Sequence, residues 1–165
     1  MSVQVPATRS VEHGTFRLER TYAATPARVF EAWANEAIKD RWFGSGDPDF
    51  LAVIDRYSLD FREGGREHLA GKVADGRTFS LDATYHQVLP DERIVYSYEI
   101  HVAGRRTSVS LVTIELAEAG MGTKLGLTEQ GVFLDTKDTN ALRRLGATDE
   151  LDKLGRYLET VPTEA

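Results

Sequence analysis

The order of apolar and polar side chains predicts one strand, two short helices, a run of strands and a helical C-terminal part. Thr15 to Tyr22 alternates between apolar and polar residues, which is typical of a half-buried strand. Thr25 followed by Pro26 predicts the start of a short helix, because threonine caps helix N-termini and proline fits the first turn. A second short helix is expected after Asn35, followed by a loop over Ser45 to Asp49.

Alternation with a period of two returns repeatedly in the middle of the chain, between turns that contain glycine or proline. The predicted strands cover about Tyr57 to Phe61, Arg66 to Val73, Phe79 to Val88, Ile94 to Val102, Thr107 to Leu116 and Thr123 to Gln130. Val88 falls out of phase with the residues before it, which indicates a β-bulge. The pattern therefore predicts an antiparallel meander, with six or seven strands in total.

The leucines of the C-terminal part do not fall on one helical face. Leu142 and Leu151 lie about 180° apart when projected at roughly 100° per residue. We therefore predict a helix break near Gly146, with a short helix before it and a second helix from about Thr148 to Glu159.

These elements predict an α+β domain in which helices cover one face of a curved antiparallel sheet. The 165 residues, 41% of them apolar, are enough for one core and too few for two. We expect a single domain over residues 15–160, with flexible tails at residues 1–14 and 161–165.

Charge and composition exclude several classes of function. A net charge of −6 and a pI near 5.3 argue against a nucleic-acid partner. The chain has no cysteine, so disulfides and thiolate chemistry are excluded. No apolar run is long enough to span a membrane and no secretory signal is visible, which makes a cytoplasmic protein the expectation. A homodimer is left open.

Motifs for metal, nucleotide or hydrolytic chemistry are absent from the sequence. The four histidines show no HExxH or similar spacing, so no metal site is predicted, and no cofactor is expected. No GxSxG elbow presents a nucleophilic serine. Asp60, Arg62 and Glu63 form a charged group at a strand end, which is most simply a surface ion pair.

Tyrosines and one glutamate are the candidates for a functional cavity. Five of the six tyrosines occupy apolar-phase strand positions, where their hydroxyls need partners or a wet cavity. Glu129 continues the inward phase of Leu125 and Leu127, so burial could raise its pKa. The alternative is that the strand has ended and Glu129 is solvated or paired with an arginine.

Several segments resemble one protein family. They include Ala24-Thr25-Pro26-Ala27-Arg28-Val29-Phe30-Glu31-Ala32-Trp33, Arg41-Trp42-Phe43-Gly44, Leu59-Asp60-Phe61-Arg62-Glu63-Gly64-Gly65, Leu89-Pro90-Asp91-Glu92-Arg93-Ile94-Val95-Tyr96, Gly122-Thr123-Lys124-Leu125-Gly126-Leu127-Thr128 and Leu151-Asp152-Lys153-Leu154. The chain resembles the heat-shock-ATPase-activator-like (AHSA-like) proteins of the SRPBCC, or START-like, superfamily. This resemblance implies the helix-grip fold, in which a curved sheet wraps a C-terminal helix around a hydrophobic cavity.

The resemblance carries no catalytic residues, and two positions depart from its pattern. Many members have a Gly-Trp pair where this chain has Gly146-Ala147, and many have histidine at the position of Glu129. Ala147 would enlarge the cavity, and Glu129 would change its charge.

Three functions follow from these observations. The first is binding of a small hydrophobic or aromatic molecule between the sheet and the C-terminal helix. The alternatives are a cyclase or hydrolase that uses a cavity carboxylate, and a cochaperone-like interaction module. The residues expected to line the cavity are Trp33, Tyr57, Phe61, Tyr85, Tyr96, Tyr98, Val112, Glu129, Ala147, Leu151 and Leu154.

Overall fold

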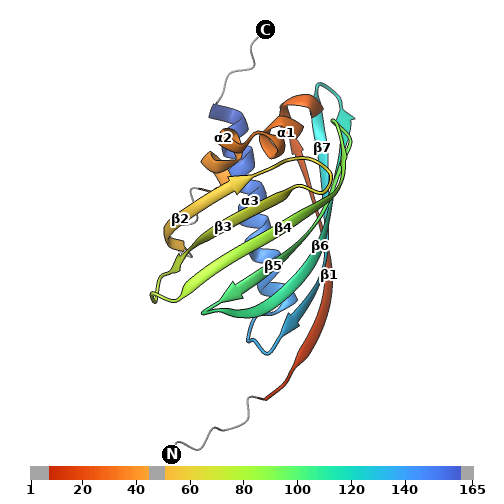
Figure 1. Ribbon diagram of the computed structural model, residues 1–165. Helices are drawn as coiled ribbons and strands as arrows, with labels where there is room; N and C mark the ends of the chain where they lie inside the picture. The colour runs from red at the N-terminus through yellow and green to blue at the C-terminus, as the bar shows by residue number, and fades with distance from the viewer. Residues whose placement is uncertain (1–7, 45–50, 161–165) are drawn as a thin grey trace, which may run out of the picture.

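A computed structural model describes residues 8–44 and 51–160 of the chain. Seven strands form one curved antiparallel sheet, and the long C-terminal helix lies across its inner face (Figure 1). The strands are β1 (Val11–Tyr22), β2 (Leu51–Leu59), β3 (Arg66–Val73), β4 (Thr78–Leu89), β5 (Arg93–Val102), β6 (Arg105–Ala119) and β7 (Gly122–Leu134). The helices are α1 (Pro26–Ala34), α2 (Glu36–Lys39), the π-helical turn η1 (Asp40–Gly44) and α3 (Asn140–Thr160). This is the predicted helix-grip α+β fold.

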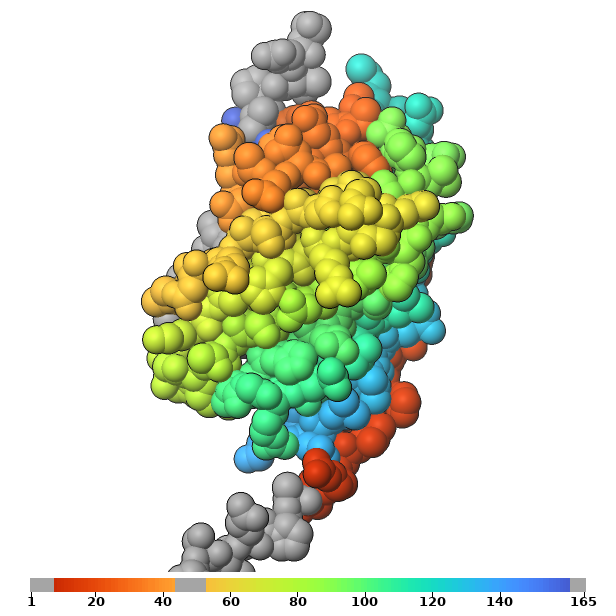
Figure 2. All heavy atoms as spheres, in the orientation of Figure 1, coloured from red at the N-terminus to blue at the C-terminus, as the bar shows by residue number. Residues whose placement is uncertain are grey.

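The strand order is β1-β7-β6-β5-β4-β3-β2, so only the pairing of β1 with β7 joins strands that are distant in sequence. Helices α1, α2 and η1 connect β1 at one edge of the sheet to β2 at the other. They pack at one end of the molecule (Figure 1). In the space-filling view from the same side, the strands form the outer surface and hide most of α3 (Figure 2). The core and the site therefore lie between the inner sheet face and α3.

Local signals in the sequence produce the predicted element boundaries in several places. The Thr25 side chain accepts a hydrogen bond from the backbone N–H of Arg28, and Pro26 is the first residue of α1. Strand β3 has the predicted limits, and the predicted bulge in β4 appears as a register shift between Tyr85 and Gln87.

Two boundaries differ from the prediction. Strand β1 begins at Val11 rather than Thr15, because Val11 pairs with Leu134 at the end of β7. Strand β2 covers Leu51–Leu59, whereas the prediction was about Tyr57 to Phe61. The observed strand therefore starts six residues earlier and ends two residues earlier than predicted. The loop predicted at Ser45 to Asp49 and the predicted tail residues 1–7 and 161–165 lie outside the described residues.

The predicted break near Gly146 is wrong, because α3 is one continuous helix from Asn140 to Thr160. Ala147, Leu151, Leu154 and Leu158 are buried and face the sheet core, whereas Leu142 and Leu145 are 54% and 65% exposed. The two sets of leucines need not share a helix face, because only the set of Leu151, Leu154 and Leu158 packs in the core. Among the described residues, no helix has the length and apolar composition required to cross a bilayer.

Candidate functional site

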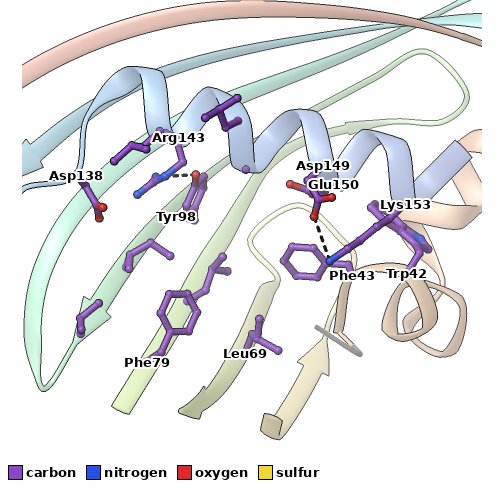
Figure 3. Close-up of a pocket in the computed structure, with 16 residues that line it drawn as sticks. Trp42, Phe43, Leu69, Phe79, Tyr98, Asp138, Arg143, Asp149, Glu150 and Lys153 are labelled. Carbon is purple, nitrogen blue, oxygen red and sulfur yellow. Dashed lines mark hydrogen bonds and ion pairs between the residues drawn. The ribbon is translucent and has the colours of Figure 1, made fainter. Parts of the chain in front are cut away.

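A pocket of about 550 Å³ lies between α3 and the inner face of strands β3, β4 and β5, with η1 at one side (Figure 3). Its sheet wall consists of the apolar or aromatic residues Leu69, Phe79, Leu81, Tyr98, Ile100 and Val102. Trp42 and Phe43 of η1 close one side. Asp138 and the α3 residues Leu142, Arg143, Leu145, Gly146, Asp149, Glu150 and Lys153 complete the wall. The pocket is therefore mainly apolar, with its ionisable groups on the helix side.

Helix α3 presents different faces to the core and to the pocket. We projected the α3 residues around the helix axis at about 100° per residue. The mean direction of the buried residues and the mean direction of the pocket-lining residues then differ by roughly 130°. Gly146 lies near the middle of the pocket face, and a Cβ built on it meets no atom within 4 Å. A larger side chain at this position would project into the pocket. The exposed Leu142 and Leu145 are explained in the same way, because they belong to the pocket wall.

Arg143 and Glu150 lie seven residues apart, between the pocket face and the core face of α3. Two helical turns, about 10 Å, separate them along the helix. They differ sharply in their partners, and this difference determines the electrostatics of the pocket.

Arg143 belongs to a hydrogen-bonded group that we call the arginine cluster, formed with Glu129, Tyr98, Ser108 and Ser110. Its guanidinium donates to the Tyr98 hydroxyl at 2.8 Å and to the Ser108 hydroxyl at 2.9 Å, and it lies 3.5 Å from the Glu129 carboxylate. Tyr98 in turn donates to Glu129 at 2.8 Å. The opposite charges of Arg143 and Glu129 are thus balanced inside the cluster.

Burial raises the pKa of Glu129, and the charge of Arg143 together with hydrogen bonds from Tyr98 and Ser110 opposes that rise. Of the two interpretations of Glu129, the inward-facing one is correct, since its side chain is buried. The arginine pairing predicted by the alternative also exists, but in the interior rather than on the surface.

The side chain of Glu150 has no hydrogen bond or ion pair with any residue in the part of the chain that the structure describes. Glu150 lines the pocket, where its side chain is half-buried. This burial raises the pKa of Glu150 to about 7. Glu150 is therefore a pocket carboxyl that can gain or lose a proton near neutral pH.

A second charged group, which we call the lysine cluster, lies behind the pocket and consists of Lys39, Glu67, Tyr57 and Tyr85. The Lys39 ammonium is 2.8 Å from the Glu67 carboxylate, and both side chains are almost fully buried. Tyr57 and Tyr85 donate to the same carboxylate at 2.6 Å and 3.0 Å. Lys39 also lies 4.8 Å from the ring centre of the pocket residue Phe43.

Most of the residues predicted to line a cavity lie close together in the structure, but they pack against one another in the core rather than line the pocket. Trp33, Tyr85, Tyr96, Val112, Ala147, Leu151 and Leu154 belong to one buried cluster, with Tyr57 and Phe61 packed against it and Glu129 buried beside it. Tyr98 is the member of the predicted set that lines the pocket. Ligand contact by the other ten residues stays a prediction.

Several site residues were missed from the sequence. A signal existed for Glu67, which shares the inward period-two phase of Leu69 and Val73. No comparable signal pointed to Lys39, Arg143 or Glu150, because their burial depends on how the helices meet the sheet.

The other charged candidates lie away from the pocket. Asp60 and Arg62 are exposed and form an ion pair at 2.9 Å, and Glu63 accepts a long hydrogen bond from the backbone of Val88. Neither carboxylate lines the pocket. In residues 8–44 and 51–160, no three histidines or carboxylates are grouped so that they could hold a metal ion.

The fold and the pocket together define a helix-grip protein, and comparison with known proteins gives its family. Residues 23–159 match the family model described as "Activator of Hsp90 ATPase homolog 1-like protein", and the chain belongs to this family. A search among curated proteins gave no significant match.

Solved structures agree with this assignment. An uncharacterized protein from Rhizobium leguminosarum is 39% identical, with a TM-score of 0.86, and the match covers 93% of this chain and 99% of that one. Mll3558 from Rhizobium loti is 40% identical, with a TM-score of 0.81 and coverage of 90% and 99%. CalU16 from Micromonospora echinospora is 21% identical, with a TM-score of 0.60 and coverage of 92% and 85%, and so shares the fold alone.

Proposed function

We propose that this protein binds a small, largely apolar molecule in the pocket between the first half of α3 and strands β3 to β5. The observation that carries the proposal is the pocket itself, whose volume of about 550 Å³ lies within the usual range for small-molecule sites. Apolar walls with a few polar groups are also typical of such sites.

The sequence of α3 supports the same function. Glycine inside a helix costs about 1 kcal/mol relative to alanine. Leu142 and Leu145 are large apolar side chains that stay exposed next to the pocket. A helix that served only to cover the core would need neither feature, so both support a role of α3 as one wall of a ligand site.

Substitution of Gly146 by a large side chain would fill the pocket and so test whether a ligand binds there. We would measure thermal unfolding with and without 2-(1-naphthyl)ethanol, a neutral aromatic probe, for the wild type, Gly146→Phe and Gly146→Ala. Ligand that binds the folded state raises its melting temperature as the ligand concentration exceeds Kd. We expect this increase in the wild type and in Gly146→Ala, and its loss in Gly146→Phe, whose ring would occupy the pocket.

Circular dichroism of each variant would show that the fold is kept. An equal increase in melting temperature for Gly146→Phe would place binding elsewhere on the protein. Absence of any increase in the wild type, with the neutral probe and with its amine and acid analogues, would overturn the proposed function.

A further inference from the structure

The ionisable residues of the pocket do not balance in charge. Arg143 is already matched by Glu129 within the arginine cluster. Lys153 lies 3.4 Å from Asp149, one turn earlier on α3, and forms an ion pair with it (Figure 3). Asp138 and Glu150 have no ion-pair partner among the described residues. The charge left over in the pocket is therefore negative.

The guanidinium of Arg143 is not available to an acidic ligand without a cost. It donates to Tyr98, Ser108 and Ser110, and its charge is opposed by Glu129. A ligand carboxylate would have to displace some of these buried contacts, and it would lie close to a second carboxylate. Leaving buried polar groups unpaired is unfavourable, so an anion is a poor match for this end of the pocket.

Glu150 lies in surroundings that suit a cation. Trp42, Phe43 and Tyr98 supply aromatic rings to the pocket that Glu150 lines. Lys39 already lies over the ring of Phe43 and Arg143 over that of Tyr98, which leaves Trp42 as the ring for a ligand cation. Aromatic faces attract organic cations, and a shielded carboxylate adds a charge-assisted hydrogen bond. The Tyr96 hydroxyl, which makes no hydrogen bond with the described residues, feels Glu150 as its strongest charged neighbour.

We propose that the ligand carries a basic nitrogen and that Glu150 binds it as a carboxylate, while the apolar body of the ligand contacts the walls of the pocket. This inference rests on the proposed function, because it concerns the ligand class of the same pocket. It narrows that class from apolar molecules in general to amphipathic amines.

The charged and titratable groups that interact with Glu150 come from six strands and helices besides its own neighbour on α3, Lys153. They are Tyr22 from β1, Lys39 from α2, Glu67 from β3, Tyr85 from β4, Tyr96 and Tyr98 from β5, and Glu129 from β7. Glu129 and Glu67 favour the protonated form of Glu150, and Lys39 and Lys153 favour the ionised form. A bound ammonium group would add to the effect of the two lysines. Amine binding should therefore be accompanied by release of a proton from Glu150.

Three probes with the same naphthalene body test the inference: 2-(1-naphthyl)ethylamine, 2-(1-naphthyl)ethanol and 1-naphthylacetate. Isothermal titration calorimetry should show that the wild type binds the amine about tenfold more tightly than the alcohol, and the acid most weakly. In Glu150→Gln the preference for the amine should disappear, while the affinity for the alcohol stays the same. Glu159→Gln, with the same chemical change at an exposed position of α3, should keep the preference.

The pH profile provides a readout that a loss of packing would not give. Because the pKa of Glu150 is about 7, affinity for the amine should rise between about pH 6 and pH 8 in the wild type and stay level in Glu150→Gln. Equal affinity of the wild type for amine and alcohol would overturn the amine inference and leave the proposed function intact. Failure of all three probes to bind would overturn both.

Discussion

The Lys39 ammonium and the Glu67 carboxylate form an ion pair 2.8 Å apart in the interior, with side chains that are 1% and 2% exposed. The pair joins α2 to β3. It therefore ties the helical segment between β1 and β2 to the sheet. It also fixes the start of η1, which carries the pocket residues Trp42 and Phe43. The ion pair is thus a structural support for one side of the pocket.

Replacing Lys39 by methionine should be strongly destabilising. The substitution keeps most of the apolar volume but leaves the Glu67 carboxylate buried without a countercharge. Loss of one partner of a buried pair typically costs about 3 to 5 kcal/mol. Urea denaturation at neutral pH would measure this loss in the free energy of unfolding.

The double variant Lys39→Met/Glu67→Gln separates lost charge balance from lost packing. Glutamine carries no charge, keeps one acceptor oxygen for one of the two tyrosine hydroxyls and can donate its NH2 to the other, so the double variant should be more stable than Lys39→Met alone. Lys72→Met, at an exposed position of β3, should change stability by less than about 0.5 kcal/mol. A double variant no more stable than the single one would contradict the assigned role of the charge.

The stability of the protein should depend on pH through Glu150. Its pKa in the folded state is about 7, above the ordinary value of 4.5, so the folded protein holds this proton more tightly than the unfolded chain does. The stabilisation is fully present below about pH 4.5 and is lost as the pH rises through about 7. The loss amounts to at most about 3 kcal/mol.

Comparison with Glu150→Gln isolates this effect from the titration of other groups, including Glu129. Free energies of unfolding would be measured for both proteins between about pH 4.5 and pH 8. The wild type should lose stability relative to the variant across this interval, which makes Glu150→Gln the more stable protein at the upper end. A constant difference across the interval would show that the carboxyl of Glu150 is ordinarily solvated.

The fold could be predicted from the sequence because its signals are local. The period-two alternation of residues 94–102 and the Thr25-Pro26 cap depend on neighbours in the chain, and both gave the observed elements. The prediction of a break in α3 was wrong because a local pattern does not show what each helix face contacts. The projection correctly separated Leu142 from Leu151, but periodicity does not tell whether an apolar face packs in the core or lines a pocket.

The pocket was harder to predict because it depends on contacts between distant elements. The wall residues Leu69, Phe79 and Leu81 read as ordinary strand positions, and their place in the pocket follows from the curvature of the sheet beneath α3. Arg143 and Glu150 are charged residues on a helix, where a solvent-exposed position is the usual expectation. Their burial becomes visible only once α3 is placed on the sheet.

The α3 glycines Gly146 and Gly155 should respond differently to alanine, and this difference tests which parts of the helix are packed and which are open. At Gly146 a Cβ meets no atom within 4 Å, so Gly146→Ala should stabilise the protein by about 0.5 to 1 kcal/mol through helix propensity. At Gly155 the new Cβ would lie 3.2 Å from the ring of Tyr22, whose hydroxyl donates to the carbonyl of Leu151 at 2.8 Å. The ring is therefore held in place, and crowding should cancel the helical gain in Gly155→Ala. Urea denaturation of both variants would decide the matter. Equal stabilisation would mean that the ring of Tyr22 does not crowd position 155 as described, whereas no gain in Gly146→Ala would mean that the helix wall at Gly146 is not open.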